Sequence, residues 1–316
     1  MNWISKFIKP KLKSLFKKKS SEDENTLWTN CSCNNLILKE DLFKNYHCCP
    51  KCGKHHKISC EERFKLTFDS NSYEIIECGM PPDDPLKFSD SKPYKDRISI
   101  ARKKTGQRDA MMIAKGKIQN IDVTVGAQNF SFIGGAVGIA SGEIFIQAVG
   151  HAIKNKTPLV FFSSSGGQKL QESGLALQMM AKTTLGVNEL KRNNLPFIVC
   201  MTNPTAGGVT ASWASLGDVI MAEPGCTISF AGARVIKDTV REELPPGFQT
   251  AEYLLDHGQI DTVIERKYLN GAIGTLLNVL LKKAEAQAKQ ESNVTVDKTC
   301  LLYTSDAADD SLRVDL

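Results

Sequence analysis

The sequence predicts an α/β protein in which buried strands alternate with helices, preceded by a small cysteine-rich module. From residue 94 onward, apolar strand-like runs alternate with stretches whose apolar residues recur at helical spacing. Two of the strand-like runs end in a pair of glycines. Five of the ten cysteines fall between Cys31 and Cys52, in a segment too poor in apolar runs to form its own core. The alternation favours a layered domain with buried sheets.

Composition and charge are those of a soluble globular protein. The 316 residues are 41% hydrophobic and 24% charged, which suits one large domain and a smaller one. The net charge of +5 arises from seven lysines among the first 20 residues, without which the chain would be slightly acidic. The charge therefore says little about the ligand of the main domain.

Residues 1–25 are expected to form a basic leader and linker. Apolar side chains recur among the lysines at near-helical spacing, and Pro10 interrupts that pattern. A solvated leader is the preferred interpretation, and an arm that binds a membrane surface or nucleic acid is the alternative. The sequence has neither a secretory signal nor a run of about 20 apolar residues that would span a membrane. We therefore expect a reducing, cytoplasmic setting.

Residues 26–58 predict a metal-binding module held by Cys31, Cys33, Cys49 and Cys52. Two residues separate Cys49 from Cys52, the spacing with which paired thiolates grip a tetrahedral zinc ion. The upstream pair is one residue short of the usual spacing, which leaves a strained four-cysteine site, a substituted ligand or a metal-free ribbon. Substitute ligands are His47, Cys48, His55 and His56. A closed ligand set is structural, because it leaves no open position for catalysis.

Residues 59–290 are predicted to form the main domain. It opens with a helix at 60–68, a strand at 73–77 and a surface loop at 80–88 that holds three prolines. A helix at 94–104 follows. Strands are then predicted at 110–118, 121–130, 159–163, 197–201, 219–222 and 227–230. Helices are predicted at 141–154, 174–193, 208–215, 233–243, 251–257 and 269–290.

Residues 291–316 are expected to be a disordered tail outside the fold. From Thr299 onward the sequence does not continue the helical pattern and is similar to translated sequencing-adapter read-through. These residues are excluded from the functional argument.

The paired glycines Gly166-Gly167 and Gly207-Gly208 each follow a buried strand and precede a predicted helix. Glycine permits φ > 0 and close approach to a ligand, because it lacks a Cβ. Amides in such a turn direct unpaired N–H donors toward one point, which suits the stabilisation of an oxyanion. Two such turns in one domain indicate chemistry performed by backbone amides.

A third glycine-rich segment, at 130–143, contains Gly134 and Gly135. It does not match the dinucleotide fingerprint in spacing, and no acidic residue follows at the required place. A turn that packs a helix closely on a sheet beside a ligand is the better interpretation.

Side-chain catalysis has weaker support. His151 and His257 lie in helical patterns and are interpreted as structural, as are the serines at 163–165, which suit turns and helix caps. Asp218 and Glu223 flank a strand, where turn or cap roles are preferred over a catalytic carboxylate pair. The sequence has no Gly-x-Ser-x-Gly nucleophile elbow.

Together these motifs are similar to those of one known protein family. From about Trp28 to about Leu281, the chain resembles the family of β subunits of bacterial acetyl-coenzyme A carboxylase carboxyltransferase. The landmarks of that resemblance are Leu27-Trp-Thr-Asn-Cys, Cys49-Pro-Lys-Cys-Gly, Asp84-Pro-Leu-Lys-Phe, Tyr94-Lys-Asp-Arg, Lys104-Thr-Gly, Phe130-Ser-Phe-Ile-Gly-Gly, Ser165-Gly-Gly, Gln178-Met-Met-Ala-Lys-Thr, Asn203-Pro-Thr-Ala-Gly-Gly-Val-Thr-Ala-Ser, Phe230-Ala-Gly-Ala-Arg-Val-Ile and Leu244-Pro-Pro-Gly-Phe-Gln.

The resemblance implies a zinc ribbon followed by a crotonase-like (ClpP/crotonase) spiral domain. It implies transfer of a carboxyl group from carboxybiotin, held on a biotin carboxyl carrier protein, to acetyl-CoA. The product is malonyl-CoA, in the first committed step of fatty-acid biosynthesis. The implied partners are biotin carboxylase and a homologous α subunit, in an α2β2 assembly with a shared active site. No nucleic-acid partner is expected.

The resemblance also assigns roles to the glycines. Gly207 and Gly208 match the position proposed in the family as a backbone oxyanion hole, and they are the expected catalytic residues. Beyond what the resemblance assigns, we hypothesise that the acyl or biotin pocket is shaped by Gly134, Gly135, Gly166 and Gly167. Because both reacting anions need only N–H donors, no protein nucleophile is required.

The chain departs from the family at three places. The cysteine pair at Cys31 is one residue short, and Ala233 stands where a proline is usual. The family usually has Gly-Gly-Ala-Arg-Met-Gln-Glu where this chain has Gly-Gly-Gln168-Lys169-Leu170-Gln-Glu. Replacing a planar, bidentate arginine by lysine is not neutral, so a phosphate or carboxylate contact at Lys169 is in question.

Three other functions remain as alternatives. A CoA hydratase or isomerase would need a carboxylate base near the glycines, and Glu172 is the candidate. A nucleic-acid-binding protein would use the cysteine module and the basic leader. An inactive subunit would explain the departures from the family pattern.

Overall fold

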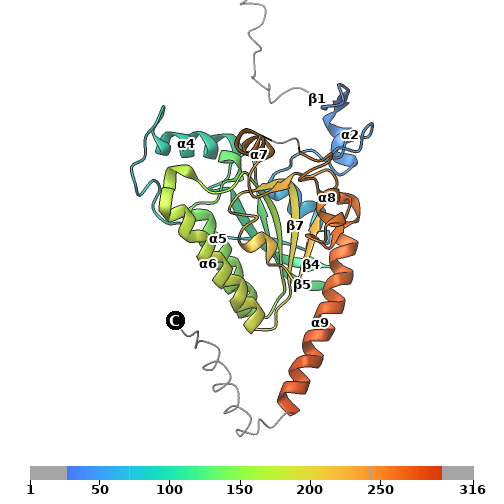
Figure 1. Cartoon of the computed structure of the whole chain (residues 1–316). Helices are drawn as coiled ribbons and strands as arrows, with labels where there is room; N and C mark the ends of the chain where they lie inside the picture. The colour runs from blue at the N-terminus through green and yellow to red at the C-terminus, as the bar shows by residue number, and fades with distance from the viewer. Residues whose placement is uncertain (1–26, 71, 242–243, 294–316) are drawn as a thin grey trace, which may run out of the picture. The chain divides into compact units, whose positions relative to one another are not determined.

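The computed structural model describes residues 27–70, 72–241 and 244–293. The chain divides into two compact units, Met1–His56 and Lys57–Leu316, and each is described by itself. The predicted leader at 1–25 and the sequence from Thr299 onward lie outside the described residues (Figure 1). The last described helix runs to Asn293, so the first three residues of the predicted tail are helical.

The first unit is a hairpin and one short helix around a very small core. Strands β1 (Trp28–Asn30) and β2 (Leu36–Leu38) pair antiparallel, and helix α2 (Lys39–Lys44) follows. Ile37 and Leu42 pack with the buried Cys31 and Cys49. Such a core is too small to stabilise the unit without a further cross-link.

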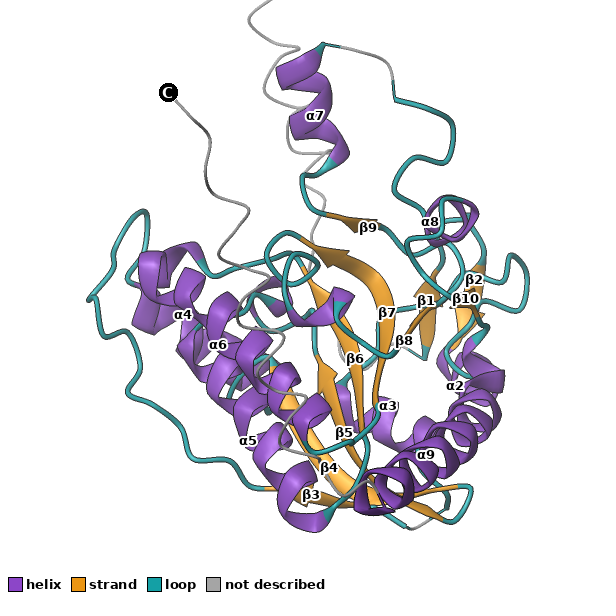
Figure 2. Ribbon diagram, turned by 60° about the horizontal axis from the view of Figure 1, so that its bottom comes forward, coloured by secondary structure: helices purple, strands orange, loops and turns teal. Residues whose placement is uncertain are grey.

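The second unit is built on an eight-stranded sheet with seven strands in the order β10-β8-β7-β6-β5-β4-β3, while β9 pairs separately with β7 (Figure 2). The β3, β4 and β5 pairings are antiparallel, and every pairing from β5 to β10 is parallel. The strands are β3 (Glu74–Ile76), β4 (Met111–Ile118), β5 (Ile121–Gln128), β6 (Leu159–Ser165), β7 (Phe197–Ala206), β8 (Val219–Ala222), β9 (Ile228–Ser229) and β10 (Thr262–Val263).

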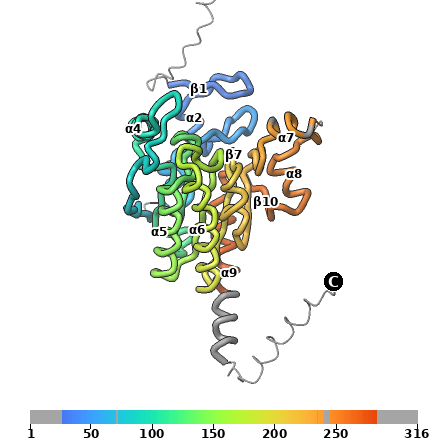
Figure 3. Tube along the Cα trace, turned by 60° about the vertical axis from the view of Figure 1, so that its left-hand side comes forward, coloured from blue at the N-terminus to red at the C-terminus, as the bar shows by residue number. Residues whose placement is uncertain are grey.

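Helices cover both faces of this sheet. Figures 2 and 3 show α5 and α6 side by side over one face, and Figure 2 shows α3 and α9 at the other. The helices are α3 (Cys60–Thr67), α4 (Tyr94–Thr105), α5 (Ile139–Asn155), α6 (Ser173–Arg192), α7 (Ala233–Val240), α8 (Ala251–Asp256) and α9 (Leu269–Asn293). Short 3₁₀ turns lie at Ile133–Gly135, Leu170–Glu172, Trp213–Ser215 and Arg266–Tyr268.

The central strand β6 contributes side chains to the hydrophobic cores on both faces of the sheet. All of its residues are buried, as expected for a parallel strand covered on both faces. Its side chains alternate between the two core clusters, with Phe161 packing toward Phe145 of α5 and Phe162 belonging to the cluster of α3 and α9. A capping box between Ser59 and Glu62 fixes the start of α3, because each residue satisfies a backbone donor of the other.

The predicted order of elements in the second unit differs from the structure in two ways: the short strand β10 was not predicted, and one predicted helix is absent. The predicted helix at 208–215 is wrong, because β7 continues to Ala206 and only a 3₁₀ turn at Trp213–Ser215 follows. The Ala211 amide donates to the Gly207 carbonyl at 3.1 Å, but the Ser212 amide donates to the Val209 carbonyl at 3.3 Å, so the first turn is not continued as an α-helix. Gly207-Gly208 therefore precedes an irregular turn, whereas Gly166-Gly167 precedes the 3₁₀ turn that leads into α6.

Among the described helices, we find none with the length and apolar character needed to cross a bilayer.

Candidate active site

The three glycine segments meet at the carboxyl ends of β5, β6 and β7. The Gly166 amide donates to the Gly134 carbonyl at 2.9 Å. A Cβ placed on Gly207 would lie 3.1 Å from the Cα of Gly167. Segments more than 30 residues apart in the sequence thus touch through their backbones. The fold brings together the glycines that the sequence singled out.

Glycine is required where these backbones approach each other. Gly135 has a φ of +62°, and a Cβ there would lie 1.9 Å from the Ser164 carbonyl oxygen. Gly207 has a φ of +64°, in the left-handed region where a side chain is disfavoured. Gly208 has no positive φ, so its position is restricted by its neighbours rather than by its backbone.

Most amides of the three turns already have acceptors within the protein. The Gly207 amide donates to the Ser229 carbonyl at 2.9 Å, and the Gly167 amide donates to the Ser165 hydroxyl at 3.0 Å. Within the described part of the chain, the amides of Gly208 and Gly134 donate to no protein acceptor. Among the described residues, the turns therefore contain two N–H donors without a protein acceptor, at the half-buried Gly134 and the buried Gly208.

Lys169 does not point to a ligand but is part of a buried ionic cluster. Its side chain is only 1% exposed, and its Nζ lies 2.7 Å from Asp109 Oδ2 and 3.8 Å from Glu172 Oε1. Asp109 also accepts a hydrogen bond from the Ser141 hydroxyl. Lys169 thus connects the segment after Gly166-Gly167 to the core. The lysine that stands where the family usually has arginine is paired with Asp109 within the protein.

Glu172 is also occupied within the protein. Its carboxylate accepts from the Tyr94 hydroxyl at 2.6 Å and from the Ile139 amide at 2.5 Å, at the start of α5. Burial, and then the hydrogen bond and charge of Glu172, raise the pKa of Tyr94 far above its usual value. Both carboxylate oxygens are engaged, which argues against Glu172 as the base of a hydratase or isomerase.

The histidines and serines have local structural partners. His151 Nδ1 lies 2.9 Å from the Thr124 hydroxyl, and His257 Nδ1 lies 2.7 Å from the Tyr253 carbonyl. Burial is the main cause that lowers the pKa of His151. The Ser163 hydroxyl lies 2.8 Å from that of Thr205. These contacts match the structural roles expected for them.

The two flanking carboxylates also hold structure together. Asp218 accepts from the Phe197 amide at 2.8 Å, which fixes the start of β7. Glu223 is buried between Arg63 and Arg266, with oxygen–nitrogen distances of 2.7 Å to each. The two carboxylates therefore do not form a catalytic pair.

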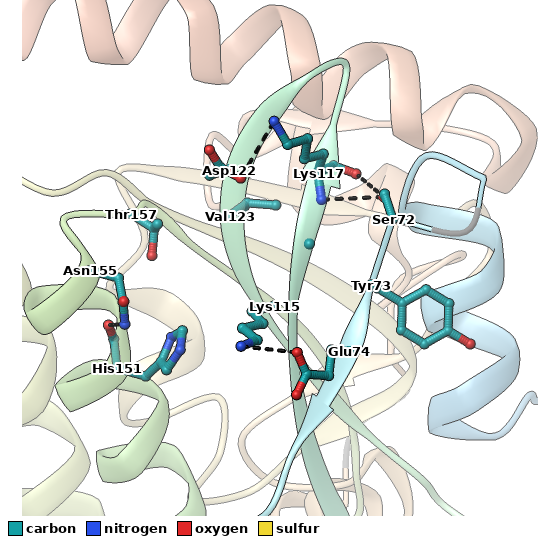
Figure 4. A pocket seen from close by; sticks show the side chains of 11 residues that line it. Ser72, Tyr73, Glu74, Lys115, Lys117, Asp122, Val123, His151, Asn155 and Thr157 are labelled. Atoms are coloured by element: carbon teal, nitrogen blue, oxygen red, sulfur yellow. Dashed lines mark hydrogen bonds and ion pairs between the residues drawn. The ribbon is translucent and has the colours of Figure 1, made fainter.

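A cavity of about 540 Å³ lies beside β3, β4 and β5 (Figure 4). Its lysines are paired: Lys115 lies 3.0 Å from Glu74, and Lys117 lies 3.8 Å from Asp122. Asp122 lies near the start of β5, whereas Gln128 at the other end donates to the Gly135 carbonyl at 3.1 Å. The cavity is therefore at the opposite edge of the sheet from the glycine turns and is not part of the candidate site.

In the first unit, the four predicted cysteine ligands form one cluster. The Sγ atoms of Cys31, Cys33, Cys49 and Cys52 all lie within 4.8 Å of one another. The Cys31–Cys52 and Cys33–Cys49 Sγ distances are 3.6 and 3.8 Å, far longer than the ~2.05 Å of a disulfide. They match the roughly 3.8 Å edge of a tetrahedron whose centre is ~2.3 Å from each sulfur.

The shortened upstream pair does not prevent this arrangement. The Asn35 side chain donates to Cys33 Sγ at 3.2 Å, and hydrogen bonds from Asn35 lower the pKa of Cys33 to about 6. The thiolate is the form that binds a metal ion. The Cys48 thiol instead donates to the Tyr46 carbonyl, and none of the alternative ligands belongs to the cluster.

The sequence did not reveal the partners of the two residues that follow Gly166-Gly167. It singled out Gln168 and Lys169 as departures but found neither Asp109 nor the packing of Gln168 on Gly208. The only available signal was the departure itself, because both contacts join segments far apart in the sequence.

Solved structures with the same fold are carboxyltransferases and related enzymes. Transcarboxylase 12S aligns with a TM-score of 0.58 and 21% identity, over 70% of this chain and 41% of that one. The Pseudomonas malonate decarboxylase MdcD-MdcE hetero-dimer aligns with a TM-score of 0.55 and 16% identity, over 75% and 95%. The α/β unit therefore shares its fold with this class of enzymes.

The sequence comparisons identify the family within that class. The family model described as "Carboxyl transferase domain" matches residues 86–291. The acetyl-coenzyme A carboxylase carboxyl transferase subunit beta of Pelagibacter ubique (strain HTCC1062) is 49% identical over 95% of this chain and 98% of its own length. That of Caulobacter vibrioides (strain NA1000 / CB15N) is 46% identical over 90% and 92%. The chain belongs to the family of acetyl-CoA carboxylase carboxyltransferase β subunits, and the resemblance read from its motifs is confirmed.

Proposed function

We propose that this chain provides one half of a shared active site that transfers a carboxyl group from carboxybiotin to acetyl-CoA and forms malonyl-CoA. The observation that carries the proposal is the convergence of three glycine turns in which, among the described residues, the Gly208 and Gly134 amides have no protein acceptor. The engaged carboxylate of Glu172 supports the same reaction, because a carboxyltransferase needs no side-chain base here.

The chemistry requires two anions. A proton leaves the acetyl methyl group, which gives a thioester enolate, and the ureido group of biotin becomes anionic when its carboxyl group departs. The N–C bond of carboxybiotin breaks to release CO2, and the ureido anion that it leaves takes the proton from the acetyl methyl group and becomes neutral biotin. The enolate then attacks the carbon of CO2, which forms the new carbon–carbon bond. Each anionic oxygen is stabilised by preorganised N–H donors, with about 3 kcal/mol from a single donor.

Within this scheme, Gly207 and Gly208 have different tasks. Gly207 shapes the turn through its positive φ and its bond to Ser229. Gly208 supplies the N–H that donates to one anionic oxygen. The remaining glycines, Gly134, Gly135, Gly166 and Gly167, form the proposed wall of the acyl or biotin pocket. A Cβ on Gly134 would meet nothing within 4 Å, whereas a Cβ on Gly135 would meet the Ser164 carbonyl, so Gly135 shapes this wall through backbone packing.

The proposed partners follow from the family. A homologous α subunit supplies the second anion-binding turn in an α2β2 assembly, and the biotin carboxyl carrier protein brings carboxybiotin formed by biotin carboxylase. The relatives' shared name supports this assignment, since it describes a subunit of a larger enzyme. The proposed setting is the cytoplasm, where thiols such as the cysteine cluster stay reduced.

We further propose that Cys31, Cys33, Cys49 and Cys52 hold a structural zinc ion in a ribbon. Their sulfur geometry suits a tetrahedral ion, and the small core of the unit needs a cross-link. Four protein ligands leave no position for substrate, so the ion contributes stability and takes no part in the transfer.

The experiment that tests the proposed function is carboxyl transfer from malonyl-CoA to biocytin, with the full chain and its cognate α subunit. Transfer by the mixture, with none by either subunit alone, is the expected result. A stable complex that transfers nothing would overturn the proposal and favour an inactive subunit.

A further inference from the structure

Gln168 occupies the junction of the three glycine turns. It follows directly after Gly167, and it pairs with Val137 in an isolated parallel bridge. The next residue, Lys169, is held by the buried ion pair with Asp109 and by a bond from its amide to the Val137 carbonyl at 2.9 Å. The backbone at Gln168 is therefore held in place, so its side chain extends from a fixed position.

The side chain of Gln168 lies directly over Gly208. A Cβ on Gly208 would be 2.7 Å from Gln168 Cγ and 2.7 Å from the end of its amide. The Met180 sulfur would be 2.8 Å away. Contacts under 3.0 Å require something to shift, so a side chain on Gly208 would have to displace Gln168 or Met180.

The amide of Gln168 joins the other two turns to this contact. Oriented so that its nitrogen faces the neighbouring carbonyls, it donates to Val137 at 2.7 Å and to Ala176 at 3.2 Å. Val137 follows the Gly134-Gly135 turn, and Ala176 lies in the first turn of α6. One side chain thus packs on Gly208 while it holds the segment after Gly134.

We propose that Gln168 is a positioning residue that fixes the Gly208 N–H relative to the Gly134 turn. This inference rests on the proposed function, since it concerns the same anion-binding site. A misplacement of about 1 Å at such a site costs on the order of 100-fold in rate. The role of Gln168 is to prevent that movement, and the side chain itself does not contact the reacting atoms.

A double-mutant cycle between Gln168 and Gly208 tests the contact. In the complex with the α subunit, we expect Gly208→Ala to lower kcat about 100-fold, because the added methyl group displaces the turn. Gln168→Ala is expected to lower kcat about tenfold. The double variant is expected to be no slower than about 100-fold, rather than about 1000-fold as for independent sites, because removal of Gln168 makes room for the methyl group.

Matched controls separate positioning from general destabilisation. Gln259→Ala removes an exposed glutamine on the loop after α8 and should add to Gly208→Ala without coupling. Gln168→Met keeps the bulk over Gly208 but loses both hydrogen bonds, and it should lower kcat with little change in the KM for malonyl-CoA. Thermal unfolding of each variant should be within a few degrees of the unaltered protein.

Two results would overturn the inference. Additive effects of Gln168→Ala and Gly208→Ala in an active complex would mean that the contact does not control the turn. A loss of activity that follows the unfolding temperature of the Gln168 variants would mean a structural role only. Absence of transfer by the unaltered complex would instead overturn the proposed function, and this inference with it.

Discussion

Lys169 Nζ lies 2.7 Å from Asp109 Oδ2, with both side chains at least 95% buried, two residues after Gly167 of the Gly166-Gly167 turn. The two residues are 60 positions apart in the chain. Breaking a buried ion pair leaves an unpaired charge in the core, which costs about 3–5 kcal/mol. The pair joins the segment after the Gly166-Gly167 turn to Asp109, which lies just before β4.

We therefore expect Lys169→Met to destabilise the protein by about 3–5 kcal/mol, because Asp109 is left as an unpaired buried carboxylate. The double variant Lys169→Met/Asp109→Leu should recover at least half of that loss. Urea unfolding of the three proteins measures the effect. A single-variant loss below 1 kcal/mol would show that the pair contributes little.

Glu172→Gln separates a carboxyltransferase from a hydratase or isomerase. The amide still accepts a hydrogen bond but loses the negative charge near Lys169 and the start of α5. We expect a lower unfolding temperature and a carboxyl-transfer kcat within about tenfold of the unaltered complex. A drop of 100-fold or more at an unchanged unfolding temperature would instead indicate a catalytic base.

Zinc content tests the cysteine cluster. We expect one zinc ion per chain in the purified protein and none in Cys49→Ser, which removes one member of the cluster. Cys48→Ser is the matched control, because the Cys48 thiol donates to the Tyr46 carbonyl outside the cluster and its loss should leave the zinc in place. Equal zinc content in the two variants would contradict the assignment.

Two buried thiols make stability depend on alkaline pH. Burial raises the pKa of Cys60 and of Cys200 to about 12. The unfolded chain loses these protons near pH 9 while the folded protein keeps them, so folding becomes less favourable as the pH rises from about 9 to 12. The expected decline is about 1.4 kcal/mol per pH unit for each thiol.

The Cys60→Ala/Cys200→Ala variant measures this contribution against the ionisation of all other groups. Its urea midpoint should fall less steeply between pH 8 and pH 10.5 than that of the unaltered protein. Identical slopes for the two proteins would mean that the thiols do not contribute.

The sequence predicted the parts of the site that depend on local rules. Glycine pairs after buried strands and the Cys49–Cys52 spacing are visible in a single chain, and most strands followed from apolar runs. The helix predicted at 208–215 failed because the backbone hydrogen bonds after Ala211 do not continue the α-helical pattern, which helical spacing does not reveal. The partners Asp109 and Gln168 acquire their roles only through tertiary contacts with distant residues.

The kcat of Gly208→Val in the α-subunit complex tests most directly whether the backbone amide of Gly208, in the turn shaped by Gly207, stabilises the anion in the transfer. Gly150→Val is the matched control, because Gly150 is exposed on α5 with open space around its Cα. We predict a loss of 100-fold or more for Gly208→Val in a folded, associated complex, with Gly150→Val within about twofold of the unaltered enzyme. Near-normal turnover by Gly208→Val would contradict the account.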